Sequence, residues 1–299
     1  MTITSVGYAG TITDSDWRRM ATAAVGSLYG VDDFASFRPT AGTGDRAVSL
    51  APGGAFGLGV RDESDAPIVV TGASVSSGSR WDLIVLRRNW GTKVTSAVIV
   101  PGSATKAIPT RNTGFGALND QPIALVRFAA GQTRVQEIID LRCIPGDAGV
   151  IAFDTLSRSY LDRVGTQVRI GNYLWTRTVD AQGSPTWLYL DVTPDTGWQE
   201  VTRNNGWSWG STSHVRRIGP MVSLRINASR SVGWAAEGNL ATIAAPFRPD
   251  RDWHVVSTHA AGKTEFEIAT DGRVNATQAS GGATAVTLRT TYPAALPTF

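Results

Sequence analysis

One stretch near the C-terminus constrains the fold most, because apolar residues alternate with polar ones on both sides of a turn signal. Phe266 and Ile268 alternate with polar residues before Asp271-Gly272, and Val274 and Ala276 resume the alternation after it. A period of two is typical of a β-strand with one buried face, and Asp-Gly between two such runs is a strong turn signal. This stretch is therefore predicted to be a β-hairpin.

The length of the turn decides which residues of the hairpin face each other. A two-residue turn would pair Ile268 with Asn275 and place Val274 on the face opposite Ile268. A three-residue loop from Thr270 to a left-handed Gly272 pairs Ile268 with Val274 instead and keeps one apolar face. We predict the three-residue loop.

Short segments rich in β-branched and aromatic residues recur through the rest of the chain, mostly bounded by Gly, Pro, Asn or Asp. Charged residues make up 18% of the chain, and 32 glycines with 14 prolines favour short strands joined by turns over long helices. We therefore predict a mainly β fold. The segments are residues 47–60, 68–70, 81–90, 94–100, 123–128, 135–142, 167–177, 186–191, 221–227, 253–257 and 286–288.

Two segments have a helical pattern. Between Asp14 and about Gly30, apolar residues beginning with Trp17 and Met20 recur near helical spacing, and Asp14 or Ser15 can cap the first turn. From 149 to 165, apolar residues spaced three or four apart among polar ones indicate a short amphipathic helix or a connector. That connector could form a brief helical stalk if three chains associate, although it is too short to show a coiled coil.

These patterns divide the chain of 299 residues into three predicted parts. Residues 1–147 form an N-terminal antiparallel β domain with one helix. Residues 148–195 form a connector with a short helix and a β-hairpin that turns at 181–185. Residues 196–299 form a C-terminal β-sandwich, because strands such as 221–227 alternate in a way that suits one buried face.

Charge, cysteine content and hydropathy exclude several classes of protein. The net charge of +3 forms no basic stripe, so we expect no nucleic-acid partner. The single cysteine, Cys143, excludes an internal disulfide and a cysteine-based zinc site, and we expect it to be buried. No segment approaches the roughly 20 apolar residues of a membrane span, and Met1–Ser5 does not begin an export signal. Synthesis in a cytosol without membrane insertion is expected.

The motifs of common enzymes are incomplete. The glycines between Gly53 and Gly59 do not fit the dinucleotide-binding spacing, and Gly262-Lys263-Thr264 lacks the first glycine of a phosphate-binding loop. His254 stands on a predicted strand without a serine elbow or a metal-binding helix, and the same motifs are missing around the other two histidines, His214 and His259. We expect no catalytic residue, metal or cofactor.

The tryptophans suggest a binding site in the C-terminal part. Trp198, Trp234 and Trp253 are expected in the core, since tryptophan is mostly buried. Trp207-Ser208-Trp209 lies in a loop-like run beside asparagines, where exposed rings could stack on sugars, or could pack between subunits. The candidate glycan-binding residues are Arg203, Asn204, Asn205, Trp207, Trp209 and Trp234, and the surrounding loops are 204–211, 230–237 and 280–282.

Two sets of motifs resemble parts of tailed-phage particles. The N-terminal set resembles the attachment domains of minor tail and upper-baseplate proteins, especially of phages that infect actinobacteria. The C-terminal set resembles the head of tail-fibre and receptor-binding proteins. The first set is Asp14-Ser-Asp-Trp17, Val48 to Gly57, Ser64-Asp-Ala-Pro67 and Arg80 to Trp90. The second is Gly197-Trp198, Ala244 to Pro249, Glu267 to Arg273 and Leu288 to Tyr292.

The resemblance implies a homotrimeric virion protein of the tail tip or baseplate, assembled in the host cytoplasm. Its N-terminal domain would dock on other tail proteins, and its C-terminal head would bind a cell-surface glycan. The chain departs from longer fibres because it lacks an extended stalk. Two alternatives stay open: a purely architectural baseplate protein, and a wall-polysaccharide-degrading enzyme that uses Asp250 or Asp252.

Overall fold

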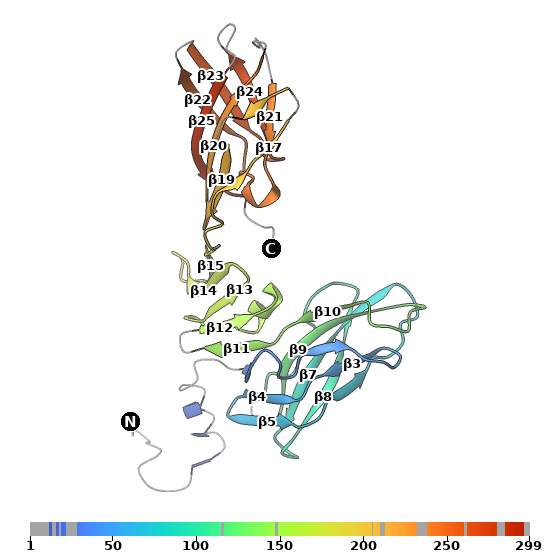
Figure 1. Cartoon of the computed structure of the whole chain (residues 1–299). Coiled ribbons are helices and arrows are strands. Elements are labelled where there is room, and N and C mark those ends of the chain that lie inside the picture. The colour runs from blue at the N-terminus through green and yellow to red at the C-terminus, as the bar shows by residue number, and fades with distance from the viewer. Residues whose placement is uncertain are drawn as a thin grey trace, which may run out of the picture. The chain divides into compact units, whose positions relative to one another are not determined.

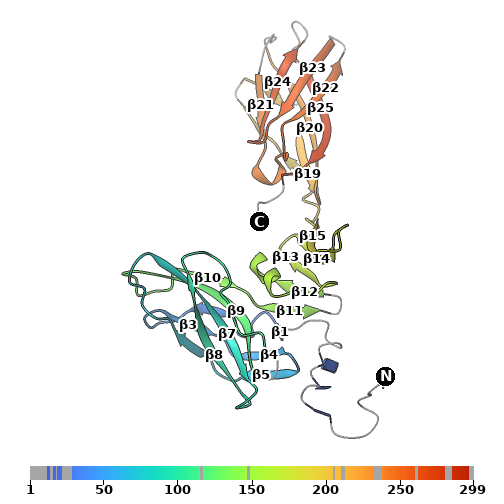
Figure 2. The ribbon, with the colours of Figure 1, turned by 180° about the vertical axis from the view of Figure 1, so that it is seen from behind.

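The computed structural model describes residues 12–13, 16–17, 19–21, 29–114, 117–146, 149–204, 206–209, 213–231, 238–259, 262–279 and 285–295. Within these residues the protein is mainly β, with 56% strand and six antiparallel or mixed sheets, none of them closed. The prediction of a mainly β fold is confirmed. Two compact units divide the chain, residues 1–189 and 190–299 (Figure 1, Figure 2). Among the described residues, no helix is long and apolar enough to span a membrane.

The described residues of the first unit form four sheets. Their strand orders are β1-β4-β5, β2-β3-β6, β10-β9-β7-β8 and β11-β12-β13-β14-β15. The strands are β1 (Tyr29–Val31), β2 (Pro39–Ala41), β3 (Ala47–Leu50), β4 (Gly53–Gly57), β5 (Val60–Ser64), β6 (Ile68–Thr71), β7 (Ser79–Asn89), β8 (Val94–Ser103), β9 (Leu118–Ala129), β10 (Glu137–Asp140), β11 (Cys143–Gly146), β12 (Gly149–Ala152), β13 (Gln167–Ile170), β14 (Tyr173–Val179) and β15 (Pro185–Asp191).

The long strands β7 and β9 are buried on both faces, which explains why residues 81–86 read as a nearly continuous apolar run. Ile84 belongs to a core that also contains Val48 of β3. Leu83 points to the other face and belongs to a second core with Val150 and Val168. The small sheet that contains β12 and β13 therefore shares a core with the long strands.

The N-terminal helix is described only in part. Residues 16–17 and 19–21 are helical, and the Thr13 hydroxyl accepts a hydrogen bond from the Asp16 N–H at 3.2 Å. Asp14 and Ser15, the predicted caps, lie outside the described residues. Tyr29 and Gly30 belong to strand β1, which pairs with β4, so the helix does not include them as predicted. Residues 22–28 lie outside the described residues.

The connector also differs from the helical prediction. Its first residues form β12, which pairs in parallel with β13. The helical part is one 3₁₀ turn, η1 (Thr155–Ser159), capped by the Asp154 carboxylate. The predicted strand 167–177 is two strands, because Gly171 adopts a φ of +56° and reverses the chain. The hairpin turn predicted at 181–185 lies between β14 and β15.

The described residues of the second unit form two sheets and one short helical turn. Their orders are β16-β19-β20-β18, with β25 also paired to β20, and β17-β21-β24-β23-β22. The elements are β16 (Gln199–Glu200), β17 (Thr202–Arg203), β18 (Ser208–Trp209), β19 (His214–Ile218), β20 (Met221–Ser229), β21 (Gly238–Thr242), η2 (Ala245–Phe247), β22 (Trp253–His259), β23 (Gly262–Ile268), β24 (Arg273–Ala279) and β25 (Ala285–Pro293).

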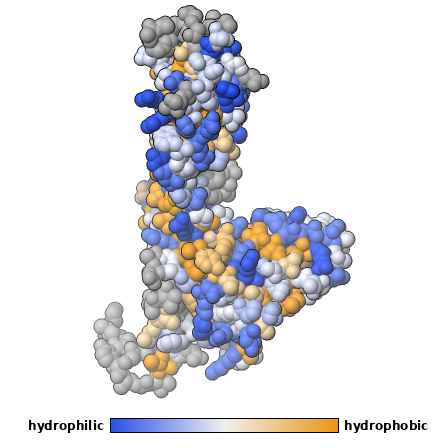
Figure 3. Space-filling model, viewed as in Figure 1, coloured by the Kyte–Doolittle hydropathy of each residue, from blue (hydrophilic) through white to orange (hydrophobic). Residues whose placement is uncertain are grey.

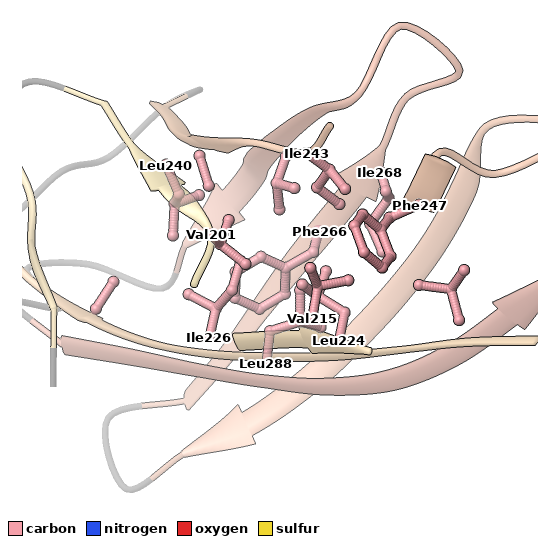
Figure 4. Close-up of a cluster of buried hydrophobic side chains, with 14 of the residues drawn as sticks. Val201, Val215, Leu224, Ile226, Leu240, Ile243, Phe247, Phe266, Ile268 and Leu288 are labelled. Carbon is pink, nitrogen blue, oxygen red and sulfur yellow. The ribbon is translucent and has the colours of Figure 1, made fainter. Parts of the chain in front are cut away.

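One hydrophobic core lies between these two sheets. Leu224 and Leu288 extend into it from β20 and β25, and Phe266 and Ile268 extend into it from β23 (Figure 4). Along β20 the buried residues alternate with outward-facing ones, as predicted for residues 221–227. Each strand of this sheet therefore presents every second side chain on the outer face.

The hairpin predicted around Gly272 is confirmed in its register. Ile268 pairs with Val274, and Gly272 has a φ of +94°. The Ala269 N–H donates to the Arg273 carbonyl at 2.8 Å, which closes the turn. Phe266, Ile268 and Val274 all lie in the core, so the loop keeps one apolar face.

Candidate functional site

The Trp207-Ser208-Trp209 run is mostly part of the core. Trp207 is only 5% exposed and packs in the core of the second unit, and the Arg230 guanidinium lies 5.0 Å from its ring centre. Trp209 is partly buried, and its Nε1 donates to the Val201 carbonyl at 3.1 Å. The expectation that both rings are exposed is therefore wrong for Trp207, because β18 pairs with β20 and carries this ring over the core.

The other predicted glycan residues are only partly brought together. Arg203 is exposed and lines a groove of about 590 Å³ with Glu200, Val201, Thr202, Ser208 and Trp209. The Asn204 amide donates to the Asn239 side-chain oxygen at 2.5 Å, which ties it to β21. Asn205 and Trp234 lie outside the described residues. Glycan binding by this set stays a prediction.

The tryptophans expected in the core divide between core and surface. Trp253 packs against the core and its Nε1 donates to the Thr290 hydroxyl at 3.3 Å. Trp198 is 38% exposed, so the expectation of burial is wrong for it. Trp198 lies immediately before β16, an edge strand that reaches the sheet only through two residues paired with β19. The ring consequently rests on the outer face of the sheet.

Two arginines from the neighbouring strands accompany the Trp198 ring. The Arg225 guanidinium of β20 lies 4.3 Å from the ring centre, and that of Arg216 on β19 lies 5.9 Å from it. Both distances are in the range of cation–π contacts. Across β25, Arg289 stands directly opposite Arg225. An aromatic ring and three arginines therefore share this outer face.

Arg216 differs from the other two arginines because a carboxylate neutralises it. Its Nε donates to Asp195 Oδ1 at 2.7 Å, and a second nitrogen bonds Asp195 Oδ2. The hydrogen bonds from Arg216, with one from the Gly197 N–H, lower the pKa of Asp195 to about 2. Within the described ranges, neither Arg225 nor Arg289 forms an ion pair.

Polar side chains surround the arginines. The Ser223 and Thr291 hydroxyls lie 3.3 Å apart and face outward from β20 and β25. Asn227 of β20 pairs with Thr287 of β25, each two residues from the Arg225–Arg289 pair. Both side chains are exposed. We name this surface the arginine face and define it by Trp198, Arg216, Ser223, Arg225, Asn227, Thr287, Arg289 and Thr291. It lies on the second unit, which presents mainly hydrophilic residues in the view of Figure 3.

The first unit has its own hollow, with a volume of about 370 Å³. Trp17 lines it, and its Nε1 donates to the Gly59 carbonyl at 2.9 Å. Arg61 and Lys93 lie on its wall, and Arg61 is paired with Asp32. The hollow is therefore bounded by an aromatic ring and basic side chains.

The residues considered for catalysis are spread over the fold. His214 is on β19, and His254 is exposed on β22, in the other sheet. The Asp252 carboxylate accepts a hydrogen bond from the Thr270 N–H at 2.9 Å, which supports the hairpin loop. In the part of the chain that the structure describes, no three His, Cys, Asp or Glu side chains gather as metal ligands.

Cys143 is buried, as predicted, and its thiol lies 2.9 Å from the Tyr160 hydroxyl. Burial raises the pKa of the Cys143 thiol to about 12, and the contact with Tyr160 only partly offsets this. A thiol is a poor nucleophile because only the thiolate reacts. Cys143 is therefore a structural residue of the core.

Comparison of the chain with known protein families and with curated proteins found no match in either. The fold and the arginine face define a mainly β protein with an exposed aromatic and basic surface on its C-terminal unit. The alternation along β20 and β25 could have indicated Arg225 and Arg289 as outward-facing residues. No sequence pattern indicated that Trp198 is exposed, because its exposure depends on how many residues of β16 pair with the sheet.

Proposed function

We propose that the chain is a structural, non-enzymatic protein of a phage tail tip or baseplate, whose C-terminal unit binds a glycopolymer on the host cell surface. In this proposal residues 1–147 attach to other tail or baseplate proteins, residues 148–195 connect, and residues 196–299 are a β-sandwich receptor-binding head. The protein is a homotrimer in the virion, assembled in the host cytoplasm.

The observation that carries the proposal is the exposed Trp198 ring on the arginine face. Tryptophan is highly buried on average, and its ring presents a flat apolar surface suited to stacking on a sugar ring. Hydroxyl and amide groups such as those of Ser223 and Asn227 stand on the same face and can bond sugar hydroxyls. A shallow polar face gives weak single sites, which several copies on one particle turn into tight attachment.

Attachment through the first unit is supported by the resemblance of its motifs. The residues that carry the resemblance include Arg80–Trp90, most of which form β7 at the centre of the long sheet. These residues fix the scaffold, and the loops and edges around it are free to contact a partner. Leu188 is 61% exposed on the edge strand β15, which favours a subunit or tail contact there.

The test is a sedimentation assay with full-length protein and cell walls from a panel of actinobacteria. The protein is expected to sediment with the walls of at least one strain, and Trp198→Ala is expected to weaken this while Trp198→Phe, which keeps a ring, retains most of it. Both variants must keep the melting profile of the wild type. Failure of the wild-type protein to bind any wall of the panel would remove the receptor-binding role.

The purely architectural alternative makes a different prediction for the same preparation. It expects a stable homotrimer that binds neither walls nor cells. Mass measurement in solution gives the number of chains, and the sedimentation assay gives the binding, so the two results together separate the alternatives. A monomer in solution would contradict the homotrimer that the receptor-binding proposal and the architectural alternative both expect.

A further inference from the structure

The arginine face contains an arrangement that costs stability in the free protein. Arg225 and Arg289 are direct partners across β20 and β25, and like charges directly opposite in a sheet repel each other. Cα atoms of such partners lie about 4.5–5.5 Å apart, so the two guanidinium groups can reach a common point. No carboxylate among the described residues forms an ion pair with either group, so no counter-charge there offsets the repulsion.

The position of Arg225 leaves its hydrogen-bond donors available. Its guanidinium lies 4.3 Å from the centre of the Trp198 ring, a distance at which the ring restricts the side chain. A guanidinium that lies over an aromatic ring can still donate N–H groups to an anion. Less side-chain entropy is then lost on binding than for a freely moving arginine.

Two guanidinium groups that start from directly paired residues fit a phosphate better than a carboxylate. A carboxylate is planar and one arginine fork binds both of its oxygens, whereas a phosphodiester group is tetrahedral and has two ester oxygens besides its two charged ones, so its acceptors extend in a second direction. A phosphodiester within a polymer keeps one negative charge and two unesterified oxygens, one for each guanidinium. The neighbouring groups of Ser223, Thr291, Asn227 and Thr287 match the hydroxyls of a polyol or sugar.

We propose that the arginine face binds a phosphodiester-linked polyol or sugar polymer, with Arg225 and Arg289 holding one phosphate group and Trp198 lying against the adjoining polyol or sugar unit. Arg216 is not a phosphate ligand in this arrangement, because Asp195 already occupies it. The inference rests on the proposed binding of a wall glycopolymer and specifies the chemistry of that polymer and the residues that select it.

The test compares intact walls with walls treated with hydrofluoric acid, which cleaves phosphodiester-linked polymers from the rest of the wall. Full-length protein is expected to bind the intact walls and to lose most of this binding on the treated ones. Arg225→Gln and Arg289→Gln are each expected to weaken binding about tenfold, and the double variant more. The control, Arg251→Gln, removes one charge from an exposed arginine outside the face and should leave binding unchanged.

Competition identifies the anion. Glycerol-phosphate oligomers are expected to displace the protein from intact walls, and polygalacturonate, which carries carboxylates, to do so at least tenfold less well. Equal displacement by polygalacturonate, a polyanion without phosphate, would overturn the proposal in favour of general polyanion binding. Wall binding that survives both the acid treatment and the double variant would overturn it as well, while leaving the receptor-binding role intact. No binding to any wall would instead remove the proposed function itself.

Discussion

Ile268 pairs with Val274 across the hairpin of β23 and β24, and this register places Gly272 in the left-handed region at a φ of +94°. A Cβ atom on Gly272 would lie 2.4 Å from the Ile243 carbonyl oxygen. That oxygen cannot retreat easily, because the Ile243 N–H donates to the Gly272 carbonyl at 2.7 Å. The loop therefore needs glycine for its backbone angle and for the space around it.

Gly272→Val is expected to destabilise the second unit more than the same change at Gly197. Gly197 has a φ of +66° but open space around it, so Gly197→Val carries only backbone strain of about 1–3 kcal/mol. At Gly272 the steric overlap adds about 1–3 kcal/mol. Hydrogen exchange of the β24 amides measures the difference, and equal exchange rates in the two variants would contradict it.

Two neighbouring arginine–aspartate pairs should differ in their contribution to stability. Arg217 bonds Asp191 at 2.5 Å and both side chains are buried, at 8% and 2% exposure. Asp191→Asn leaves the Arg217 charge buried without a counter-charge, and we expect a loss of about 3 kcal/mol in the free energy of unfolding. Asp195→Asn is the control, because its pair with Arg216 is exposed and should contribute little. Calorimetry that gives similar melting temperatures for both variants would contradict this.

Asp120 makes the stability of the first unit depend on pH. Burial acts to raise the pKa of Asp120, but hydrogen bonds from Arg87 and Asn112 outweigh it and leave the pKa below its ordinary value. A carboxyl with a lowered pKa in the folded state stabilises the fold above its unfolded pKa of about 3.9, and the contribution disappears as the pH falls through the folded pKa. As the pH decreases below about 4, the melting temperature should decrease. The Asp120→Asn variant should show a weaker dependence of the melting temperature on pH.

Local patterns in the sequence predicted the mainly β fold and the hairpin register, because alternation and turn residues act over a few positions. The prediction for Trp198 was wrong because burial depends on the number of strands that pair beside it, and β16 pairs over only two residues. Trp207 lies in a stretch that looks loop-like in sequence. It is nevertheless buried, because the adjoining strand β18 pairs with β20 and places the Trp207 ring over the core. The arginine face combines residues from three strands and the segment before a fourth, and sequence spacing alone does not bring them together.

Cys143 should be unreactive in the folded protein. Its pKa of about 12 reduces the thiolate fraction at pH 8 roughly a thousandfold relative to a free cysteine, and its burial blocks access. A chromogenic disulfide reagent should therefore label no thiol in the native protein and one thiol per chain in guanidinium chloride. Rapid labelling without denaturant would show that the core around Tyr160 opens.

The two tryptophans whose burial differs from the sequence prediction give a direct test of where binding occurs. Trp207→Ala removes a side chain that is 5% exposed from the core, and we expect a loss of about 3–5 kcal/mol in the free energy of unfolding of the second unit. Trp198→Ala removes a surface ring and its contact with Arg225, with an expected loss of about 1 kcal/mol or less. Thermal unfolding checks both values, and wall sedimentation is then measured below the melting temperature of the weaker variant. Trp198→Ala should lose binding while folded. If folded Trp207→Ala protein loses binding and Trp198→Ala keeps it, the site lies at the Trp209 groove and the arginine face is not the receptor surface.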